Sequence, residues 1–548
     1  MEAVIIDGYV DEPAHHGAPP YISTYPRYVA GAMVDAGLEE EDIGYYTVDE
    51  IREDREKRKD AVGADLLVVI TGMAVPVSSV GGEYMTLEEM EELSEDSEGV
   101  SIIGGPVRFG VFHGGGELHS EIPDSFDFRA EKGDIETAVY DLLSNGMERF
   151  EDRRRESDEL EIWAKKGAFI VEKHPNHPDY IITEVKIGRG CPFNCSFCVE
   201  PLYGEPRFRE PESVVEEVEE LNRRGINDFR LQAPNFLTYG GDGFEPNPDA
   251  MERLYRGINE AVEGLETLHL DNFNAKTISR FPEKSRKCLE IISKYNTPGD
   301  TCSLGLESAD ESVQRANNLS ITNEECMEAI RMLNEVGGFR VDGGKSLPKL
   351  LPGVNFVFGL KGQTEETFRK NYEFLKKVYD EGLMLRRINL RQVSTHPGTG
   401  MEEFGDKLVR EHKSLFKKWK KRIREEIDRP MLERVAPVGT VIRNVYTEFH
   451  DGKKTFARPL GSYPLLIGMD SEYELGEKFD VAITDYGFRS VTGVKYPLNV
   501  NDASMSELKS VPGIGSKRAG KLVINRPFED FEEIKGMVDE VSEKFLTC

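Results

Sequence analysis

The sequence predicts an α/β protein of four successive parts: a doubly wound parallel sheet, a partial (β/α)6 barrel, a small β-barrel and a helix-hairpin-helix. Apolar strands alternate with helices over residues 1–165 and again over residues 166–432. Short strands with close turns fill residues 433–500. The turn Pro-Gly-Ile-Gly separates two short helical stretches within residues 501–548. With 548 residues the chain is too long for one core, so several domains are expected.

The first part is expected to bind a ligand at one edge of its sheet. Its apolar strands are placed at 3–7, 43–48, 66–70 and 100–106, with a helix opened by Pro26. Ligands of doubly wound sheets bind beyond the carboxyl ends of the strands. These ends are Asp7-Gly8-Tyr9, Thr71-Gly72-Met73 and Gly104-Gly105-Pro106. The candidate ligand-binding residues are those of the last two: Thr71, Gly72, Met73, Gly104, Gly105 and Pro106.

The second part repeats a strand-helix rhythm that is typical of a β/α barrel, in which the strand ends carry the active site. An amphipathic helix at 134–143 leads into it. The expected helices are 211–225, 249–263, 283–294, 322–336 and 364–381, and the expected strands are 228–233, 267–271, 302–307, 354–359 and 387–393.

Three cysteines lie close together within Gly188–Pro201, at positions Cys191, Cys195 and Cys198. This C-x3-C-x2-C spacing supplies three thiolates, one fewer than a cubane iron–sulfur cluster takes, so one iron is left open for a small molecule. The alternative is a structural zinc site, which usually pairs two Cys or His hooks. The remaining cysteines are scattered and offer no second hook, so the cluster is favoured.

This cysteine loop resembles the signature of the radical S-adenosylmethionine (radical SAM) superfamily, and Phe197 before the last cysteine fits that pattern. The resemblance implies a [4Fe-4S] cluster whose open iron binds SAM, and an electron donor such as ferredoxin or flavodoxin. It also implies that Glu307, in Ser-Leu-Gly-Leu-Glu-Ser, meets the SAM ribose or amino group. Three polar residues at strand ends are either SAM contacts or satisfied core residues: Gln232, Asn235 and Arg391.

The first part resembles the Rossmann-like cobalamin-binding domain of one radical SAM class, because Thr-Gly and Gly-Gly follow two of its strands. The chain lacks the D-x-H-x-x-G motif of that domain, so no protein histidine is expected as the lower ligand of cobalamin. His15 and His16 are interpreted as loop residues. The alternative is an empty Rossmann-like scaffold, as in methylthiotransferases.

Residues 433–500 resemble the TRAM/OB-like barrel of methylthiotransferases, and residues 504–523 resemble a helix-hairpin-helix whose backbone amides can hold a phosphate. Nucleic acid is kept open as a partner but disfavoured, because the net charge of −31 repels phosphate backbones. The basic stretch 411–434 carries Phe416 and Trp419 and is expected to be a packed linker helix.

The order of the four parts resembles an archaeal group of radical SAM proteins with a C-terminal helix-hairpin-helix. The resemblance implies a cobalamin-dependent C-methyltransferase that modifies an unactivated carbon of a protein side chain after translation. A glutamine of methyl-coenzyme M reductase is the first candidate substrate. Catalytic residues are not identified by the sequence; the candidates for relaying a hydrogen atom are Tyr9, Tyr21 and Tyr25.

Two alternative functions remain. A methylthiotransferase acting on tRNA or protein would need a second cluster held by three N-terminal cysteines, and no cysteine precedes Cys191. A nucleic-acid-binding protein with a structural cluster is opposed by the negative charge and by the open-iron spacing. No apolar run approaches the ~18 residues of a membrane span and no secretory leader is recognised, so a cytoplasmic enzyme is expected.

Overall fold

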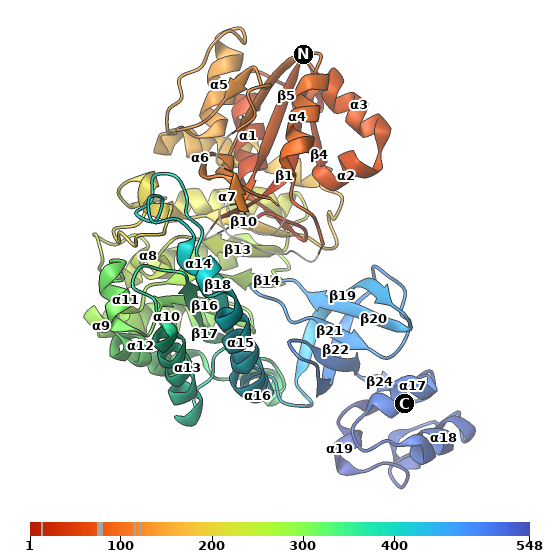
Figure 1. The fold of residues 1–548 in the computed structure, drawn as a ribbon. Coiled ribbons are helices and arrows are strands. Elements are labelled where there is room, and N and C mark those ends of the chain that lie inside the picture. Colours follow the sequence, from red (N-terminus) through yellow and green to blue (C-terminus); the bar gives the residue numbers. More distant parts are fainter. Residues whose placement is uncertain (13–14, 74–80, 114–116, 120–121) are drawn as a thin grey trace.

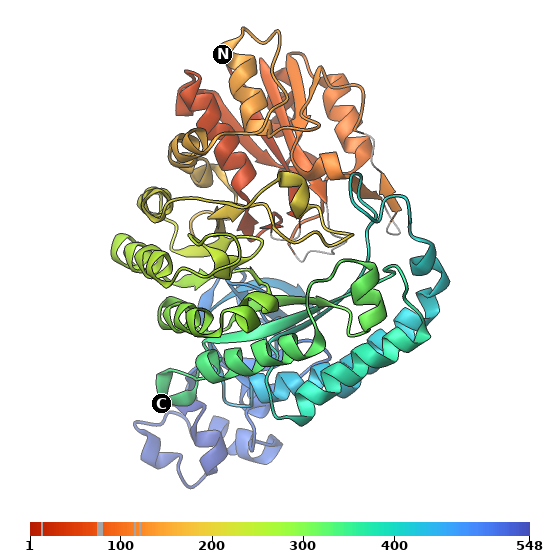
Figure 2. The same cartoon turned by 90° about the vertical axis from the view of Figure 1, so that its left-hand side faces the viewer.

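The computed structural model describes residues 1–12, 15–73, 81–113, 117–119 and 122–548. The N-terminal sheet lies at one end of the molecule, the β/α barrel in the middle, and the small β-barrel with the C-terminal helices at the other end (Figures 1 and 2). Among the described residues, no helix is both long and apolar enough to cross a membrane.

The N-terminal sheet is parallel over five strands in the order β4-β1-β5-β6-β9, with the short β2 added antiparallel to β1. Helices cover both faces (Figure 1), and alternate residues of each strand pack against different helix layers. The strands are β1 (Ala3–Glu12), β2 (His15–His16), β4 (Ile43–Thr47), β5 (Leu66–Met73), β6 (Val100–Gly104) and β9 (Phe128–Arg129). The helices are α1 (Thr24–Asp35), α2 (Val48–Glu53), α3 (Arg55–Gly63), α4 (Leu87–Asp96), α5 (Ile135–Ser144) and α6 (Ser157–Lys166).

The barrel is built from two four-stranded parallel sheets, in the orders β3-β10-β13-β14 and β15-β16-β17-β18. Each strand expected from the sequence is present within a few residues. The barrel strands are β10 (Ile182–Lys186), β13 (Asp228–Gln232), β14 (Thr267–His269), β15 (Asn272–Phe273), β16 (Asp300–Glu307), β17 (Leu350–Phe358) and β18 (Arg387–Gln392). The outer helices are α7 (Pro211–Arg223), α8 (Pro248–Ala261), α9 (Ala275–Arg280), α10 (Pro282–Tyr295), α11 (Glu311–Ala316), α12 (Asn323–Gly337) and α13 (Glu365–Asp380).

One barrel strand comes from the N-terminal part of the chain. Residues Tyr21 and Ile22 form β3 and pair in parallel with Ile182 and Thr183 of β10. The N-terminal part therefore completes the barrel sheet, an arrangement that the sequence analysis did not anticipate.

The basic stretch after the barrel is a packed helix, as expected. Helix α15 (Lys413–Ile423) lies along α13 between α14 (Lys407–Glu411) and α16 (Arg429–Val435). Phe416 is buried against Phe358, with ring centroids 5.1 Å apart, and the ring of Trp419 lies 5.6 Å from that of Tyr372. The apolar side of the basic stretch is thus used within the protein itself.

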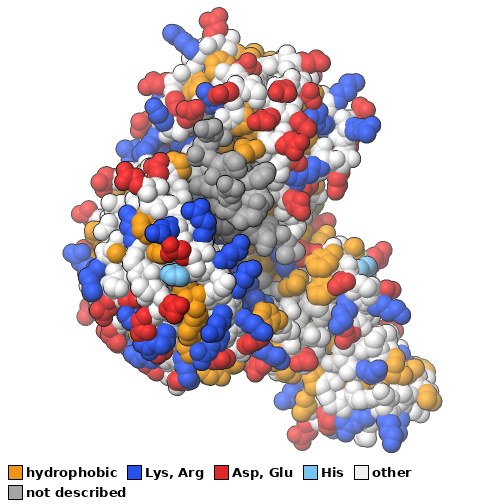
Figure 3. Space-filling view, in the orientation of Figure 1, with side chains coloured by type: hydrophobic (Ala, Val, Ile, Leu, Met, Phe, Trp, Pro, Cys, Tyr) orange, Lys and Arg blue, Asp and Glu red, His pale blue; other side chains and the backbone are white. Residues whose placement is uncertain are grey.

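The C-terminal part begins with a closed five-stranded barrel in the order β19-β20-β21-β23-β22. The strands are β19 (Val441–Asp451), β20 (Lys454–Pro459), β21 (Ile467–Met469), β22 (Lys478–Tyr486) and β23 (Val491–Lys495). The tail holds α17 (Met505–Ser510), α18 (Ser516–Ile524) and α19 (Glu540–Glu543), and joins β24 (Leu498–Asn499) to β25 (Leu546–Thr547). On the face shown in Figure 3, acidic and basic side chains are interspersed.

Candidate active site

The cysteine loop is closed at its neck by its own backbone. Strand β11 (Gly188–Arg189) pairs antiparallel with β12 (Arg207–Phe208). Gly190 has a φ of +79°, and a Cβ atom there would lie 2.6 Å from the carbonyl oxygen of Gly204. Only glycine permits this approach, so Gly190 allows the two ends of the loop to lie close together.

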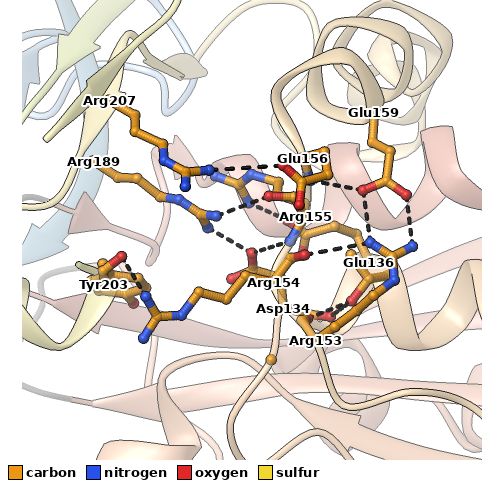
Figure 4. Close-up of polar contacts among 12 residues, drawn as sticks. Asp134, Glu136, Arg153, Arg154, Arg155, Glu156, Glu159, Arg189, Tyr203 and Arg207 are labelled. Carbon is orange, nitrogen blue, oxygen red and sulfur yellow. Dashed lines mark hydrogen bonds and ion pairs between the residues drawn. The ribbon is translucent and has the colours of Figure 1, made fainter. Parts of the chain in front are cut away.

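A buried ion pair ties this neck to the N-terminal part (Figure 4). Nη1 of Arg189 lies 2.6 Å from Oδ2 of Asp134, and Nη2 of Arg189 donates to the carbonyl oxygen of Arg155 over 3.2 Å. The same Asp134 oxygen accepts a hydrogen bond from the backbone N–H of Arg155 at 2.9 Å. Burial acts to raise the pKa of Asp134, but the charges of Arg155, Arg189 and Arg108 outweigh it and hold that pKa well below its ordinary value.

A second arginine holds the other side of the neck. Arg154 donates through Nη1 to the carbonyl oxygen of Tyr203 at 2.6 Å and through Nη2 to that of Leu202 (Figure 4). The guanidinium of Arg108 lies 4.8 Å from the centroid of the Tyr203 ring, and the amine of Lys186 lies 5.4 Å from it. These contacts fix the segment that follows the third cysteine.

The three cysteines line one cavity of about 190 Å³ at the carboxyl ends of the barrel strands. Burial raises the pKa of the Cys191 thiol to about 11 and that of Cys195 to about 12, and it raises the pKa of Cys198 well above its ordinary value. The other lining residues come from the cysteine loop, from strands β15, β16, β17 and β18, and from the turns after β13 and β18; they include Phe193, Phe197, Glu200, Asn235, Asn272, Ser303, Glu307, Asn355, Arg391, Ser394 and His396.

The far end of the cysteine loop is anchored to the barrel by Asn317. The backbone N–H of Ser196 donates to the Asn317 carbonyl at 3.0 Å, and the Ser196 hydroxyl donates to Asn317 Oδ1 at 2.8 Å. Asn317 is fully buried and also accepts from the backbone N–H of Lys361. The loop is therefore supported at its tip as well as at its neck.

Glu307 is a buried carboxyl group with an unused oxygen. It ends β16 with a φ of +59°, a left-handed conformation that a residue with a side chain rarely adopts. Its Oε2 has no hydrogen-bond partner among the described residues. Burial raises the pKa of Glu307 to about 7, although the charge of Arg391 acts in the opposite direction. A buried carboxyl oxygen left unsatisfied fits a donor group on a bound ligand.

The other predicted SAM contacts differ in where they lie. Phe197 and Arg391 line the cavity with Glu307, whereas Gln232 is buried at the end of β13 and is not among the lining residues. Asn235 reaches the cavity, but its amide donates to Thr277 and accepts from the backbone of Asn274, both at 3.1 Å. The nitrogen and the oxygen of the Asn235 amide therefore each have a partner within the protein.

Sequence reasoning missed three hydroxyl and amide residues that line the cavity: Ser303, Asn355 and Ser394. The hydroxyl oxygens of Ser303 and Ser394 have no hydrogen-bond partner among the described residues. A signal was present, because Asn355 is a polar residue within the apolar strand Val-Asn-Phe-Val-Phe, and a period of two places it on the barrel interior.

The donor set fits an iron–sulfur cluster better than a single metal ion. Among the described residues, no three His, Cys, Asp or Glu side chains are arranged to ligate one ion. A cubane cluster binds each thiolate at a different iron, so the thiolates need not converge on one point. Three partly buried thiols around one cavity, with the unsatisfied oxygen of Glu307 among its lining atoms, suit a cluster with one open iron.

The tyrosines proposed to relay hydrogen mostly have other partners. The Tyr9 hydroxyl donates to Oδ2 of Asp49 at 3.0 Å, and the Tyr21 hydroxyl donates to the carbonyl of Gly461 in the small barrel. The Tyr25 hydroxyl lies 3.4 Å from that of Tyr203, directly after the cysteine loop. Of the three, Tyr25 is the one in contact with this loop.

The predicted ligand edge of the N-terminal sheet is closely packed around its glycines. A Cβ atom on Gly72 would lie 1.9 Å from the backbone nitrogen of Val107, and one on Gly104 would lie 2.7 Å from the side chain of Ile135. Gly105, with a φ of +94°, turns the chain into the short helix η2 (Pro106–Phe109).

Thr71 and Met73 also belong to that predicted ligand edge. The Thr71 hydroxyl donates to the carbonyl of Gly8 at 3.4 Å. Met73 ends β5, and its side chain lies outside the described residues. The buried Nε of Arg108 in η2 has no hydrogen-bond partner among the described residues, so a donor is available at this edge.

This edge and the cysteine loop are in contact. Phe109 packs with Val199 and Tyr203, and the Phe109 and Tyr203 rings meet edge to face with centroids 5.8 Å apart. The ring nitrogen Nδ1 of His396, which lines the cysteine cavity, lies 2.8 Å from the carbonyl oxygen of Phe109. A ligand at the carboxyl edge of the sheet would thus lie next to the cluster cavity.

Comparison with known proteins gives matches over most of the chain. Residues 185–375 match the model of the radical SAM superfamily, and residues 497–523 match the helix-hairpin-helix motif. An uncharacterized protein of Methanocaldococcus jannaschii is 41% identical over 511 residues, which cover 90% of this chain and 92% of that protein. The tRNA-2-methylthio-N(6)-dimethylallyladenosine synthase of Bdellovibrio bacteriovorus is 25% identical over 45% of this chain and 49% of its own.

Among solved structures, the radical S-adenosylmethionine methyltransferase TsrM from Kitasatospora setae, with tryptophan and a SAM analogue bound, superposes with a TM-score of 0.48. It is 15% identical, and the match covers 73% of this chain and 75% of that one.

Proposed function

We propose that this chain, which belongs to the radical SAM superfamily, is a cobalamin-dependent C-methyltransferase acting on an unactivated carbon of a protein side chain. A radical SAM domain carries a [4Fe-4S] cluster and SAM. We propose cobalamin as the third cofactor, beside the cluster and SAM. The observation that carries the proposal is the contact of the N-terminal sheet edge with the cysteine loop through Phe109, Val199 and Tyr203.

The contact matters because methyl transfer to a substrate carbon needs the donor and the carbon radical close together. When bound, the cofactors supply a 5′-deoxyadenosyl radical that removes a hydrogen atom from the substrate, and a methyl group that takes its place. The chain's task is to hold these groups side by side. The contacts of Arg189 with Asp134 and of Arg154 with Tyr203, at the neck of the loop, hold the cysteine loop in a fixed position relative to the N-terminal sheet.

Individual residues have separate parts in this proposal. Cys191, Cys195 and Cys198 bind three irons of the cluster. Glu307 accepts a hydrogen bond from the amino group or ribose of SAM through its unsatisfied oxygen, and Arg391 balances its charge. The buried Nε of Arg108 offers a donor to cobalamin at the sheet edge.

The substrate class is proposed as a protein side chain, with a glutamine of methyl-coenzyme M reductase as the first to be tested. The support is the order of the four parts, which resembles an archaeal group with this C-terminal module. The negative charge of the chain opposes nucleic acid as the substrate. An oxygen-sensitive cluster fits a reducing cytoplasm, where ferredoxin or flavodoxin would supply the electron.

A methylthiotransferase activity is the second candidate, favoured by the match to the Bdellovibrio bacteriovorus enzyme. It would need cysteines in the N-terminal part for a second cluster. The chain has none before Cys191, so this candidate lacks ligands that the reaction needs.

The test starts from protein purified without oxygen, reconstituted with iron and sulfide, mixed with hydroxocobalamin and desalted. We expect about one corrinoid retained per chain, together with the absorbance of one cluster. With a reductant, trideuteromethyl-SAM and a peptide containing the reductase glutamine, we expect one trideuteromethyl group on the peptide. The variant in which all three cysteines are alanine should keep the corrinoid and form no 5′-deoxyadenosine. A cluster that forms 5′-deoxyadenosine without any retained corrinoid would refute the proposal.

A further inference from the structure

A second cavity, of about 330 Å³, lies at the opposite end of the barrel from the cysteines. It is lined by residues that begin the barrel strands: Asp228 of β13, Thr267 of β14, Gly299 before β16, and Arg386 before β18. Its other wall comes from the small β-barrel, at the start of β19 and in the segment 459–465 after β20. Figure 1 shows β14 and β19 next to each other at this junction.

The segment 459–465 is held in place by the barrel. The Ser462 hydroxyl donates to the carbonyl of Leu270 at 2.9 Å, and Nε of Arg230 donates to the same hydroxyl at 3.2 Å. The Tyr21 hydroxyl donates to the carbonyl of Gly461. The cavity is therefore a built feature of a fixed interface.

His269, at the end of β14, is one of the residues that line this cavity. Its Nδ1 accepts a hydrogen bond from the backbone N–H of Ser462 at 2.8 Å, so the proton of the neutral ring is on Nε2. The side chain is 4% exposed, and burial lowers the pKa of His269 to about 3. Nε2 has no hydrogen-bond partner among the described residues.

Arg386 is a cation without a carboxylate partner. It forms no ion pair within the described part of the chain; Nη2 donates to the carbonyl of Tyr463 at 2.8 Å, and Nε has no partner. The acids that act on it are Asp300 and Asp428. Asp428 pairs with Arg424, and Asp300 accepts hydrogen bonds from Asn296 and from backbone amides.

Arg386 is charged at neutral pH, so the absence of a carboxylate partner in the described part of the chain is energetically unfavourable. Burial lowers the pKa of Arg386 to about 10, which leaves the guanidinium charged at neutral pH. A charge removed from water without an opposite charge is unfavourable, so an anion at this position would stabilise the protein. The neighbouring Arg387 stacks on Tyr463 at 3.9 Å and adds to the positive potential.

The remaining charges of the cavity largely compensate one another. Lys478 pairs with Glu266, and Nε of Arg443 lies 3.1 Å from Oδ2 of Asp342. Burial raises the pKa of Asp228 to about 6, and Lys478 is the cation that acts on it. Most of the rest of the wall is apolar: Pro298, Val341, Leu347, Val441, Ile442, Pro459, Leu460, Pro464 and Leu465.

We propose that this cavity is a second ligand site and that it takes a small organic carboxylate. The carboxylate binds the guanidinium of Arg386 and the Nε2–H of His269, and the apolar part of the ligand fills the space between the barrel and the small β-barrel. A single negative charge suits Arg386 beside its acidic neighbours, whereas a phosphate dianion would be repelled by Asp228 and Glu266. The site shares no lining residue with the cysteine cavity.

The test uses the full-length, cluster-containing protein with 4-bromophenylacetate as the probe and 4-bromophenylacetamide as its uncharged counterpart. Titration calorimetry should show saturable binding of the carboxylate, and at least ten-fold weaker binding of the amide. Arg386→Met should weaken carboxylate binding at least ten-fold. Arg434→Met is the matched control, because Arg434, like Arg386, donates to backbone carbonyls and forms no ion pair within the described part of the chain, but it does not line the cavity.

The proposal is overturned if the two probes bind equally, if Arg386→Met binds as the unmodified protein does, or if neither probe binds in the millimolar range. Tighter binding of inorganic phosphate than of the carboxylate would overturn the ligand class. Crystals of the unmodified protein soaked in the bromo-carboxylate give a test that does not depend on how a variant folds. Anomalous bromine signal in this cavity, with the carboxylate on Arg386, supports the site, and signal only elsewhere refutes it.

Discussion

Arg189 and Asp134 form a buried ion pair, with Nη1 and Oδ2 2.6 Å apart, between the neck of the cysteine loop and the N-terminal part. Arg189 lies two residues before the first of the three cysteines, and Asp134 precedes α5, which packs on the N-terminal sheet. The pair joins the two proposed cofactor sites through one short contact. Its removal should therefore affect both stability and the cluster.

Replacing Asp134 by asparagine should destabilise the protein by about 3–5 kcal/mol, because Arg189 and Arg155 lose their shared counter-charge inside the protein. Urea unfolding at neutral pH measures this. Asp124→Asn is the control, because Asp124 is 94% exposed in its pair with Arg129, and it should change little. Equal stability of the two variants would show that the buried charges are otherwise compensated.

The same pair sets a pH dependence. The folded state holds the pKa of Asp134 below its ordinary value of 3.8, so the stability it contributes is present above that value. It is lost only as pH falls below the ordinary carboxyl range, through the lowered pKa of the folded state. The stability difference between the unmodified protein and Asp134→Asn should therefore be constant from pH 5 to pH 8, as measured by urea unfolding across that range.

Arg154→Met should loosen the segment after the third cysteine, because both of its hydrogen bonds go to the carbonyls of Leu202 and Tyr203. We expect at least two-fold less iron per chain after reconstitution and a changed electron paramagnetic resonance signal of the reduced cluster. Arg207→Met is the control. This arginine is on the same neck, but its side chain is 63% exposed, and its one ion pair among the described residues is a long one, 3.8 Å between its Nη1 and Oε2 of Glu156. Equal iron content and equal spectra in both variants would contradict the role of Arg154.

Much of the barrel could be predicted, because its strands and helices have clear hydrophobic periods and breaks. The helix predicted at 364–381 is α13 (Glu365–Asp380), and the strand predicted at 228–233 is β13 (Asp228–Gln232). The two-residue strand Tyr21–Ile22 could not be assigned, because its partner in β10 lies about 160 residues further on and no local pattern selects the sheet.

The candidate active site could also be predicted only in part from the sequence. Cysteine spacing predicted three metal ligands, and all three thiols line one cavity together with Glu307. Asp134 and Arg154 lie in a stretch rich in charged residues, and no local pattern tells a buried ion pair from a solvated charge, so their contacts with the loop could not be anticipated. The second cavity depends on how the small β-barrel docks, which no local sequence pattern encodes.

Phe416→Ala tests whether the basic helix α15 is part of the folded core. The Phe416 ring is buried against Phe358, so its removal should cost about 3 kcal/mol of unfolding free energy. Lys418→Ala, on the exposed side of the same helix, should change stability little and serves as the control. Urea unfolding compares the two; a small effect of Phe416→Ala would mean that the helix is only loosely attached.

Glu307→Gln separates the binding of SAM from the binding of the cluster. Glutamine keeps the shape of the side chain but cannot carry the negative charge, so we expect unchanged iron content and at least ten-fold weaker SAM binding, measured by equilibrium dialysis.

The folded pKa of Glu307 is raised from 4.5 to about 7, so its ionisation destabilises the ligand-free fold as pH rises from about 4.5 to about 7. Glutamine removes this cost. The variant should be more stable than the unmodified protein at pH 8, by up to about 3 kcal/mol, and similar to it at pH 4.5. Thermal unfolding of the ligand-free protein at the two pH values measures the difference, and an equal stability difference at both would show that this carboxyl group is not the one destabilised by burial.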